Sequence, residues 1–383
     1  MATQIDIDQP PAAGLAGEHA GSVADDSDHR LQALRKKLAR RAEPDRSQLF
    51  RRTFQIAFLL LNLWIGGAFY FWVRGFELGI HDRNSLRPAG VEGWLPIAGL
   101  MNLKYWLTSG HLPGIHPAAL FLFLSFLAIA FLFRKAFCSW LCPVGTLSEF
   151  LWRAGRRILR RNFSLPRWLD LPLRSLKYVL LGFFVWAVGN MSADAVEEFM
   201  RSPYGVIADV RMLNFFRYVG GTAAVILALL VVASVLVQNF WCRYLCPYGA
   251  LLGIASLLSP FRIRRSADAC IDCAKCAKAC PSALPVDKLV SIKSAECTGC
   301  LECIAVCPAE GALQMALPKW TRSPKQSPKA ERLPAWTMAA GIAVLFLGIV
   351  GYAKAAGYWN GNVPDYIYRQ LVPQANVVEH PAE

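Results

Sequence analysis

The sequence predicts an integral membrane protein with an all-α helical core of about five transmembrane helices and a smaller α+β domain inserted into it. Three observations lead to this prediction. Apolar residues make up 55% of the 383 residues, several apolar runs are long enough to cross a bilayer, and all twelve cysteines fall into four compact motifs. Cysteines grouped in this way are typical of cofactor ligation or redox chemistry rather than of a disulfide framework.

The first segment of the chain, residues 1–53, is predicted to precede the membrane core. Residues 1–29 are rich in Asp, Ala, Gly and Pro, which predicts a disordered tail, and residues 30–52 form a basic stretch that would adjoin anionic membrane lipid. The whole chain carries a net charge of +14. Because its basic residues adjoin apolar runs, this charge indicates membrane topology, and we expect no nucleic-acid partner.

Five apolar runs have about the 20 residues that cross a hydrocarbon core. They are Phe54–Val73, Pro117–Phe133, Leu173–Met191, Val219–Val237 and Ala335–Ala353. Arg174 and Lys177 lie within the third run, where we expect them to snorkel to water. Lys and Arg are concentrated before the first, third and fifth runs, which predicts a bacterial inner-membrane protein with a cytoplasmic N-terminus, cytoplasmic cysteines and a periplasmic C-terminus.

The outside loop between the first two spans, residues 74–116, is rich in apolar and aromatic residues, as is typical of an interfacial or re-entrant segment. Its titratable groups would lie near the membrane surface, where they either anchor the loop or hydrogen-bond and deprotonate a quinol headgroup. The candidates for quinol contacts are Arg87, Glu92, His111 and His116.

The sequence contains an internal repeat. FCSWLCPVGTL begins at Phe137, WCRYLCPYGAL begins at Trp241, and each directly follows a predicted span, so the repeat unit is predicted to be a helical hairpin ending in Cys-x3-Cys-Pro. The candidate metal or redox residues are Cys138, Cys142, Cys242 and Cys246. Two thiols per copy leave four alternatives open: a site shared by both copies, a transient disulfide, a soft-metal site for Cu(I), or thiols that only pack.

The strongest motif is the segment from Cys270 to Pro308, which contains Cys-x2-Cys-x2-Cys-x3-Cys-Pro twice. This is the spacing of bacterial two-cluster ferredoxins, in which the fourth Cys of each run ligates the other [4Fe–4S] cluster. The expected ligands are Cys270, Cys273, Cys276 and Cys307 for one cluster and Cys280, Cys297, Cys300 and Cys303 for the other. A zinc site, the alternative, would leave thiolates over.

These features divide the chain into six predicted segments. They are residues 1–53 (tail and basic stretch), 54–152 (two spans and the first motif), 153–260 (two spans and the second motif), 261–317 (the two-cluster domain), 318–334 (a linker rich in Pro, Lys and Ser) and 335–383 (the last span and an outside tail).

The stretches RPAGVEGWLP, KAFCSWLCPVGTLSE and FWCRYLCPYGALLG, together with the doubled cysteine run, resemble the NapH/NosR group of membrane-bound polyferredoxins over roughly residues 53–317. The resemblance implies two cytoplasmic [4Fe–4S] clusters and electron transfer from the quinone pool toward a periplasmic respiratory reductase of anaerobic respiration, such as denitrification, or its maturation. It covers the membrane core alone, without the flavin-binding domain of NosR-like proteins. A flavin- or haem-containing redox partner is therefore expected to carry electrons outward.

The leading functional hypothesis is an electron-transfer component of a quinol dehydrogenase system. Its clusters are carriers rather than catalysts, so no catalytic residue is assigned. The alternative is a cupric reductase or copper-handling assembly factor similar to CcoG-like proteins, because paired thiolates suit Cu(I). A third hypothesis treats the ferredoxin unit as a redox-sensing docking module.

Overall fold

The computed structural model describes residues 45–80, 87–160, 163, 165–317 and 333–381. The predicted disordered tail, the first part of the basic stretch and nearly all of the predicted linker lie outside these residues.

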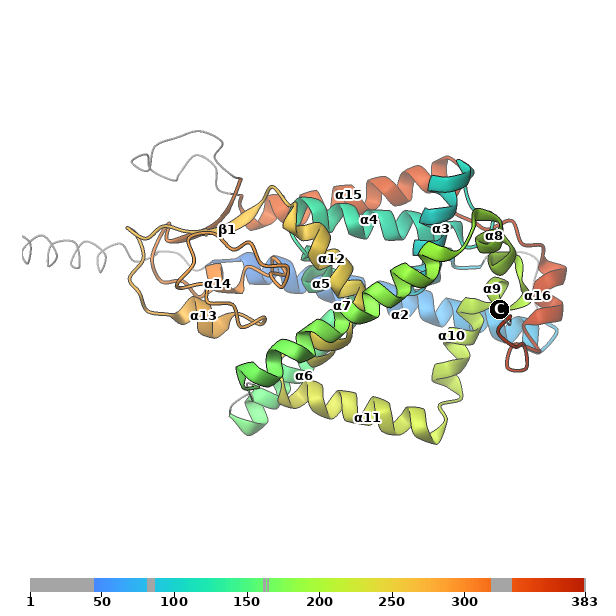
Figure 1. Ribbon diagram of the computed structural model, residues 1–383, viewed down its shortest axis with the longest axis horizontal. Coiled ribbons are helices and arrows are strands. Elements are labelled where there is room, and N and C mark those ends of the chain that lie inside the picture. Colours follow the sequence, from blue (N-terminus) through green and yellow to red (C-terminus); the bar gives the residue numbers. More distant parts are fainter. Residues whose placement is uncertain (1–44, 81–86, 161–162, 164, 318–332, 382–383) are drawn as a thin grey trace, which may run out of the picture.

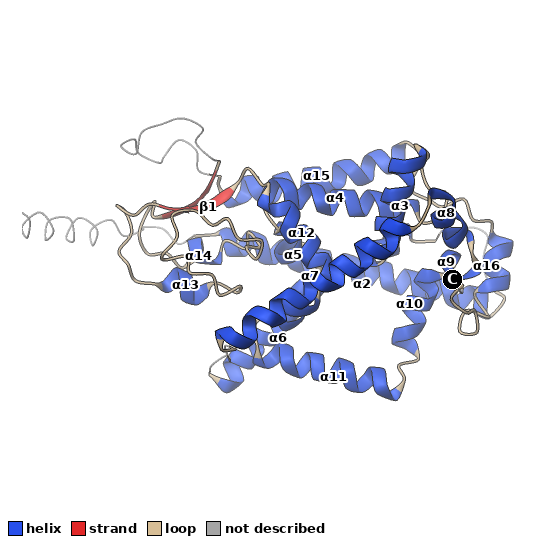
Figure 2. Ribbon diagram, viewed as in Figure 1, coloured by secondary structure: helices blue, strands red, loops and turns tan. Residues whose placement is uncertain are grey.

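Helices make up most of the described structure (Figure 1; Figure 2). Among the described residues, three helices are long and apolar enough to cross a membrane: α2 (Ser47–Glu77), α7 (Arg167–Asn190) and α15 (Ala335–Ala355). They correspond to the first, third and fifth predicted spans. The fourth corresponds to α10 (Ala208–Arg217) and α11 (Gly221–Leu236), which are bent by 81° and count as one broken span at most. A mostly helical membrane protein is confirmed, whereas five spans stay a prediction.

The second predicted span forms helix α4 with the predicted bounds, Pro117–Phe133. It has 17 residues, fewer than the other candidates, and most of its side chains are buried. Helices α3 (Pro96–Ser109), α12 (Pro247–Leu257) and α15 pack around it. A helix that is apolar on every side is suited to this central position.

The two repeat copies are interlocked. In the first copy α4 is followed by α5 (Ala136–Trp140) and α6 (Pro143–Leu159), and in the second α11 is followed by η2 (Trp241–Leu245) and α12. Helix α4 packs against α12 and helix α6 packs against α11, so the helix before each motif contacts the helix after the other motif. This arrangement differs from two self-contained hairpins, and it brings the two motifs together.

The cysteine-rich segment forms a small α+β domain at one end of the long helices (Figure 1). Strand β1 (Arg262–Arg265) pairs antiparallel with β2 (Leu313–Ala316), and the buried Ile263 lies opposite the buried Met315. Between the strands, the short helices α13 (Lys275–Ala279) and α14 (Glu302–Ala305) pack against each other.

The opposite end of the molecule is built from short helices. They are η1 (Ala89–Trp94), α3, α8 (Ala193–Arg201), α9 (Pro203–Val206) and α16 (Asp365–Leu371). Helix α2 joins the two ends, because it contacts α14 of the cysteine-rich domain and also α16 (Figure 1).

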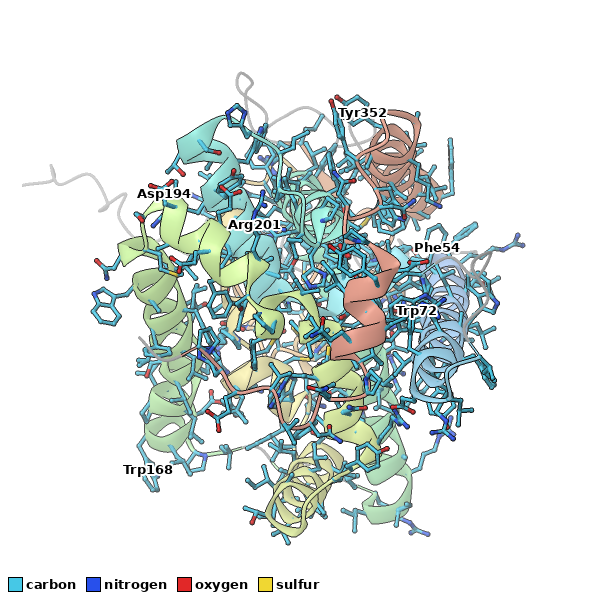
Figure 3. The ribbon with its side chains drawn as sticks, turned by 90° about the vertical axis from the view of Figure 1, so that its right-hand side faces the viewer. Phe54, Trp72, Trp168, Asp194, Arg201 and Tyr352 are labelled. Atoms are coloured by element: carbon cyan, nitrogen blue, oxygen red, sulfur yellow. The ribbon has the colours of Figure 1, made fainter. Side chains whose placement is uncertain are left out.

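Basic residues of α7 do not behave as the sequence predicted. The Lys177 side chain is fully buried and forms an ion pair with Glu296 at 2.6 Å instead of snorkelling to water. Arg174 pairs with Asp170, one turn away in the same helix, at 2.6 Å. The pattern of α7 alone could not show that a carboxylate from the cysteine-rich domain reaches this helix. Apolar side chains such as Trp168 point outward, as expected of a lipid-facing helix (Figure 3).

Candidate functional site

The Cys-x3-Cys-Pro motifs break one helix and begin another. Cys138 lies in α5 and Cys142 caps the N-terminus of α6, with Pro143 in the first turn. In the second copy Cys242 lies in η2 and Cys246 caps α12. Each capping sulfur accepts a hydrogen bond from a backbone N–H three residues on, at 3.4 Å for Cys142 and 3.2 Å for Cys246. Proline fits because the first turn of a helix has no use for its missing N–H.

The four thiols of the two motifs line one cavity. We call Cys138, Cys142, Cys242 and Cys246 the four-thiol group. Burial, and to a lesser degree the neighbouring thiols, raise the pKa of Cys138 to about 12, and burial raises that of Cys142 to about 11. Sulfurs in such a place become thiolates only together with a compensating positive charge.

Lys135 is the buried cation beside this group, with only 3% of its surface exposed. It lines both the large cavity and a smaller one next to it, and its Nζ is 3.5 Å from the point where a Cβ on Gly249 would lie. Within the described residues Lys135 forms no salt bridge, although its charge helps to lower the pKa of the nearby Glu296 against the opposing effect of burial. An unpaired buried ammonium favours a negative charge close by.

The cysteine-rich domain repeats the same backbone geometry in its two loops. Asp272 and Ala274 adopt left-handed conformations, with φ of 53° and 52°, and so do the equivalent Gly299 and Leu301, with φ of 61° and 59°. Such conformations are rare for residues with a side chain and are held only where the surroundings require them. A small cavity in this domain is lined by four cysteines, namely Cys280, Cys297, Cys300 and Cys303. They are the predicted ligands of the second cluster.

The first motif is hydrogen-bonded to one of these loops. Ser139 Oγ donates to the carbonyl of Thr298 at 2.7 Å, and Trp140 Nε1 donates to the carbonyl of Gly299 at 3.1 Å. The smaller cavity lies at the same junction and is lined by Cys138 and Cys242 on one side and Cys300 on the other. The four-thiol group and the predicted second cluster are therefore direct neighbours.

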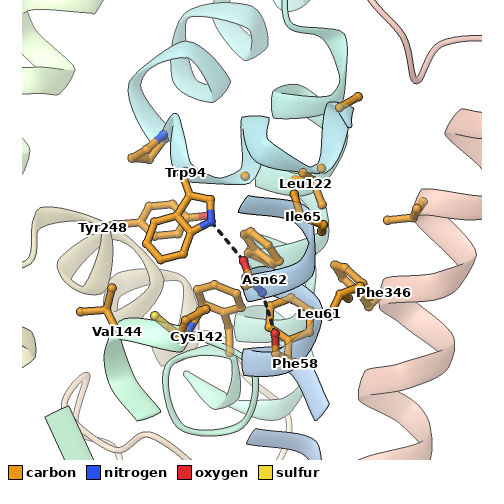
Figure 4. Close-up of a pocket in the computed structure, with 18 of the residues that line it drawn as sticks. Phe58, Leu61, Asn62, Ile65, Trp94, Leu122, Cys142, Val144, Tyr248 and Phe346 are labelled. Atoms are coloured by element: carbon orange, nitrogen blue, oxygen red, sulfur yellow. Dashed lines mark hydrogen bonds between the residues drawn. The ribbon is translucent and has the colours of Figure 1, made fainter. Parts of the chain in front are cut away.

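The large cavity has a volume of about 890 Å³ and is mostly apolar. Its walls include residues of α2, η1, α4, α5, α6, η2, α12 and α15. Figure 4 shows Trp94 reaching across it to Asn62, whose Oδ1 accepts a hydrogen bond from the indole at 3.0 Å, with Tyr248 nearby. Trp64 of α2 and Leu347 of α15 also line it, yet each is more than 60% exposed. The lining of the cavity therefore includes exposed side chains of two candidate membrane helices.

Three of the four predicted quinol contacts lie in one buried ionic network, and Arg87 alone of them lines the cavity. Arg87 binds Glu92 at 2.6 Å and Asp209 at 2.5 Å, and His116 Nδ1 lies 3.2 Å from Glu92. Burial opposes charge on both members of the His116–Glu92 pair, but Arg87 and His116 lower the pKa of Glu92, and Glu92 raises that of His116. His111 is exposed and does not belong to the network. These contacts connect η1, α10 and the start of α4, and a role of these residues as quinol contacts stays a prediction.

Comparison with known proteins places the chain in a family. It is 48% identical over 331 residues to YccM of Escherichia coli, a protein named for a proposed role in electron transport, and this match covers 86% of the chain and 92% of YccM. The chain belongs to the NapH/NosR-type family of membrane-bound polyferredoxins.

More distant members match this polyferredoxin over about half of its length. The ferredoxin-type protein NapH of Escherichia coli is 29% identical over 218 residues, which are 54% of the chain and 70% of NapH. Protein NirI of Paracoccus denitrificans is 34% identical over 195 residues, which are 49% of the chain but only 27% of NirI. No solved structure gives a significant match.

Two family models match the polyferredoxin. One, described as a 4Fe-4S dicluster domain, covers residues 262–317 and confirms the iron–sulfur nature of the cysteine-rich domain. The other, described as a 4Fe-4S binding domain, matches twice, at residues 115–166 and 219–266. These two stretches are the repeat copies, and each contains a single Cys-x3-Cys-Pro motif.

Sequence reasoning about this polyferredoxin missed Lys135 and the cavity. Lys135 lies in the basic stretch before the third predicted span, which by sequence indicates topology, whereas in the structure it is buried beside the thiols. Its position three residues before Cys138 was the available signal. The cavity had no local signal, because its walls come from segments far apart in the chain.

Proposed function

We propose that this polyferredoxin oxidises quinol within the membrane and passes the electrons to two [4Fe–4S] clusters in its cysteine-rich domain. One cluster is held by Cys270, Cys273, Cys276 and Cys307 and the other by Cys280, Cys297, Cys300 and Cys303. Three features support these ligands. They are the doubled Cys-x2-Cys-x2-Cys-x3-Cys-Pro spacing, the left-handed conformations at equivalent positions of the two loops, and the small cavity that the second set of cysteines lines. When bound, each cluster supplies one-electron transfer.

The observation that carries the proposal is the cavity. Its volume and apolar lining are those of small-molecule sites, and it is lined both by exposed side chains of α2 and α15 that lipid would cover and by the four-thiol group. Asn62, Trp94 and Tyr248 provide the polar groups that would orient a quinol headgroup. Oxidation of one quinol to quinone releases two electrons and two protons, which matches one electron for each of the two clusters.

The concentration of basic residues supports a cytoplasmic cysteine-rich domain. The C-terminal helix α16 would then lie on the periplasmic side, since it is at the other end of α2. Onward transfer would require a flavin- or haem-containing redox partner at the membrane or in the periplasm, and the electrons would serve a respiratory reductase or its maturation.

The test is anaerobic mixing of the oxidised protein with a menaquinol or ubiquinol analogue, followed by electron paramagnetic resonance. Reduced-cluster signals are expected. Ala68→Phe fills the cavity from α2 and should slow their appearance at least tenfold, whereas Ala57→Phe, on the exposed face of the same helix, should not. If dithionite reduces the clusters and quinol does not, quinol oxidation is wrong.

The copper alternative rests on the four-thiol group, because paired thiolates suit Cu(I), but it leaves the large apolar cavity without a role. Cu(II) reduction by the dithionite-reduced protein, with Cu(I) retained at the four-thiol group, would favour that alternative over quinol oxidation.

A further inference from the structure

We propose that the four-thiol group holds one further iron–sulfur cluster, shared between the two repeat copies. The site itself is independent of quinol oxidation, and only its place in the electron path rests on the proposed function. Four observations support it.

The first observation is the interlocked fold. Each copy supplies only two cysteines, and a cubane cluster takes four thiolates. Because α4 packs on α12 and α6 packs on α11, the pairs Cys138/Cys142 and Cys242/Cys246 come to line the same cavity. Neither copy could complete a four-thiolate site alone.

The second observation is the donor set. All four candidate ligands are cysteine sulfurs, and no His, Asp or Glu is among the described residues that line the cavity. Cys thiolates are the usual ligands of iron–sulfur clusters.

The third observation is charge. Four thiolates around an oxidised [4Fe–4S] core leave two net negative charges, which a buried site must balance. Lys135 lies beside the group, is almost completely buried and has no salt-bridge partner among the described residues. The N-termini of α6 and α12 also point at the thiols through Cys142 and Cys246, and their helix dipoles favour negative charge there.

The fourth observation is position. Cys138 and Cys242 line both the large cavity and the smaller one that Cys300 also lines, and the loop that carries Cys300 is hydrogen-bonded to α5. These residues would hold a one-electron carrier between a quinol bound in the cavity and the predicted second ferredoxin cluster.

The test is the iron and acid-labile sulfide content of the full-length protein, purified and reconstituted without oxygen. Three [4Fe–4S] clusters give about twelve irons per chain and two give about eight. Cys138→Ser and Cys242→Ser should each remove about a third of the iron, and the double variant should remove no more than either single one. Val144→Ala, next to the first motif and not a ligand, should keep all the iron.

Several results would overturn the inference. One is a loss of iron in the double variant that equals the sum of the losses in the two single variants. Another is an unchanged iron content in the single variants, and a third is one copper or zinc ion per chain bound at the four-thiol group. If the variants fold too poorly to purify, the wild-type protein decides, because about eight irons per chain contradicts the third cluster. Failure of quinol to reduce a protein with twelve irons would refute the proposed function and leave this site intact.

Discussion

Two glycines at equivalent positions of the repeat differ in how close their neighbours are. A Cβ on Gly145 would lie 2.1 Å from the carbonyl oxygen of Cys138, whereas on Gly249 the nearest atoms would be 3.5 Å away. We therefore expect Gly145→Ala to displace the first motif, to lower the melting temperature and to lose iron. Gly249→Ala should keep the melting temperature and the iron content close to those of the wild type. Thermal unfolding in detergent with iron analysis checks this, and equal effects of the two changes would contradict it.

His116 should make the stability of the fold depend on pH. Although burial alone would lower its pKa, the hydrogen bond and charge of Glu92 raise it above 6.5 in the folded protein. A raised pKa stabilises the fold fully below pH 6.5, and this contribution disappears as the pH rises through the folded-state value. The melting temperature is expected to fall over that range, and His116→Gln should flatten the dependence. If the melting temperature of the variant depends on pH as steeply as that of the wild type, another group causes the dependence.

At the scale of elements, Arg51 connects three helices. Its guanidinium, in α2, binds Glu149 of α6 at 2.6 Å and Glu302 of α14 at 2.8 Å. Burial alone would raise the pKa of Glu149, but Arg51 lowers it to about 2. Arg51→Met would leave the largely buried carboxylates of Glu149 and Glu302 without the positive charge of this guanidinium. We expect the free energy of unfolding to fall by about 3–5 kcal/mol.

The matched control for this change is Arg52→Met, because Arg52 is the exposed neighbour on the same helix. Thermal unfolding of the two variants should show a clear loss for Arg51→Met alone. Adding Glu149→Gln to Arg51→Met should recover part of the stability, and the absence of any recovery would argue against the ionic contact as the cause.

The elements that the sequence predicted well are those with a local signal. The long apolar runs became α2, α7 and α15, and the cysteine spacing located the iron–sulfur domain. What was missed depends on contacts between distant segments. The hydropathy of α4 and α12 cannot show that they pack together, and Lys177 could not be recognised as the partner of Glu296, which is far away in the chain. The same holds for the candidate site. Each Cys-x3-Cys-Pro pair could be recognised from the sequence, but the sequence does not show that the two pairs lie close together.

At the scale of the whole molecule, the cysteine-rich domain and helix α16 lie at opposite ends of α2 (Figure 1). If the basic segments face the cytoplasm, a reporter active only in the periplasm should be active when fused after Ala353 and inactive when fused after Leu317. A reporter that fluoresces only in the cytoplasm should give the reverse result and serves as the control. Activity of the first reporter at both positions would refute the proposed orientation.

The interlocked repeat also has a consequence for biosynthesis. A ribosome that has passed Cys142 has made only half of the four-thiol group, and the other half follows only after helices α6 to α11, when Cys246 emerges. The packing of α6 on α11 and of α4 on α12 likewise waits for the second copy. The nascent chain must therefore hold its first thiol pair incomplete during insertion into the bilayer, which makes maturation of this centre a late, post-insertion event.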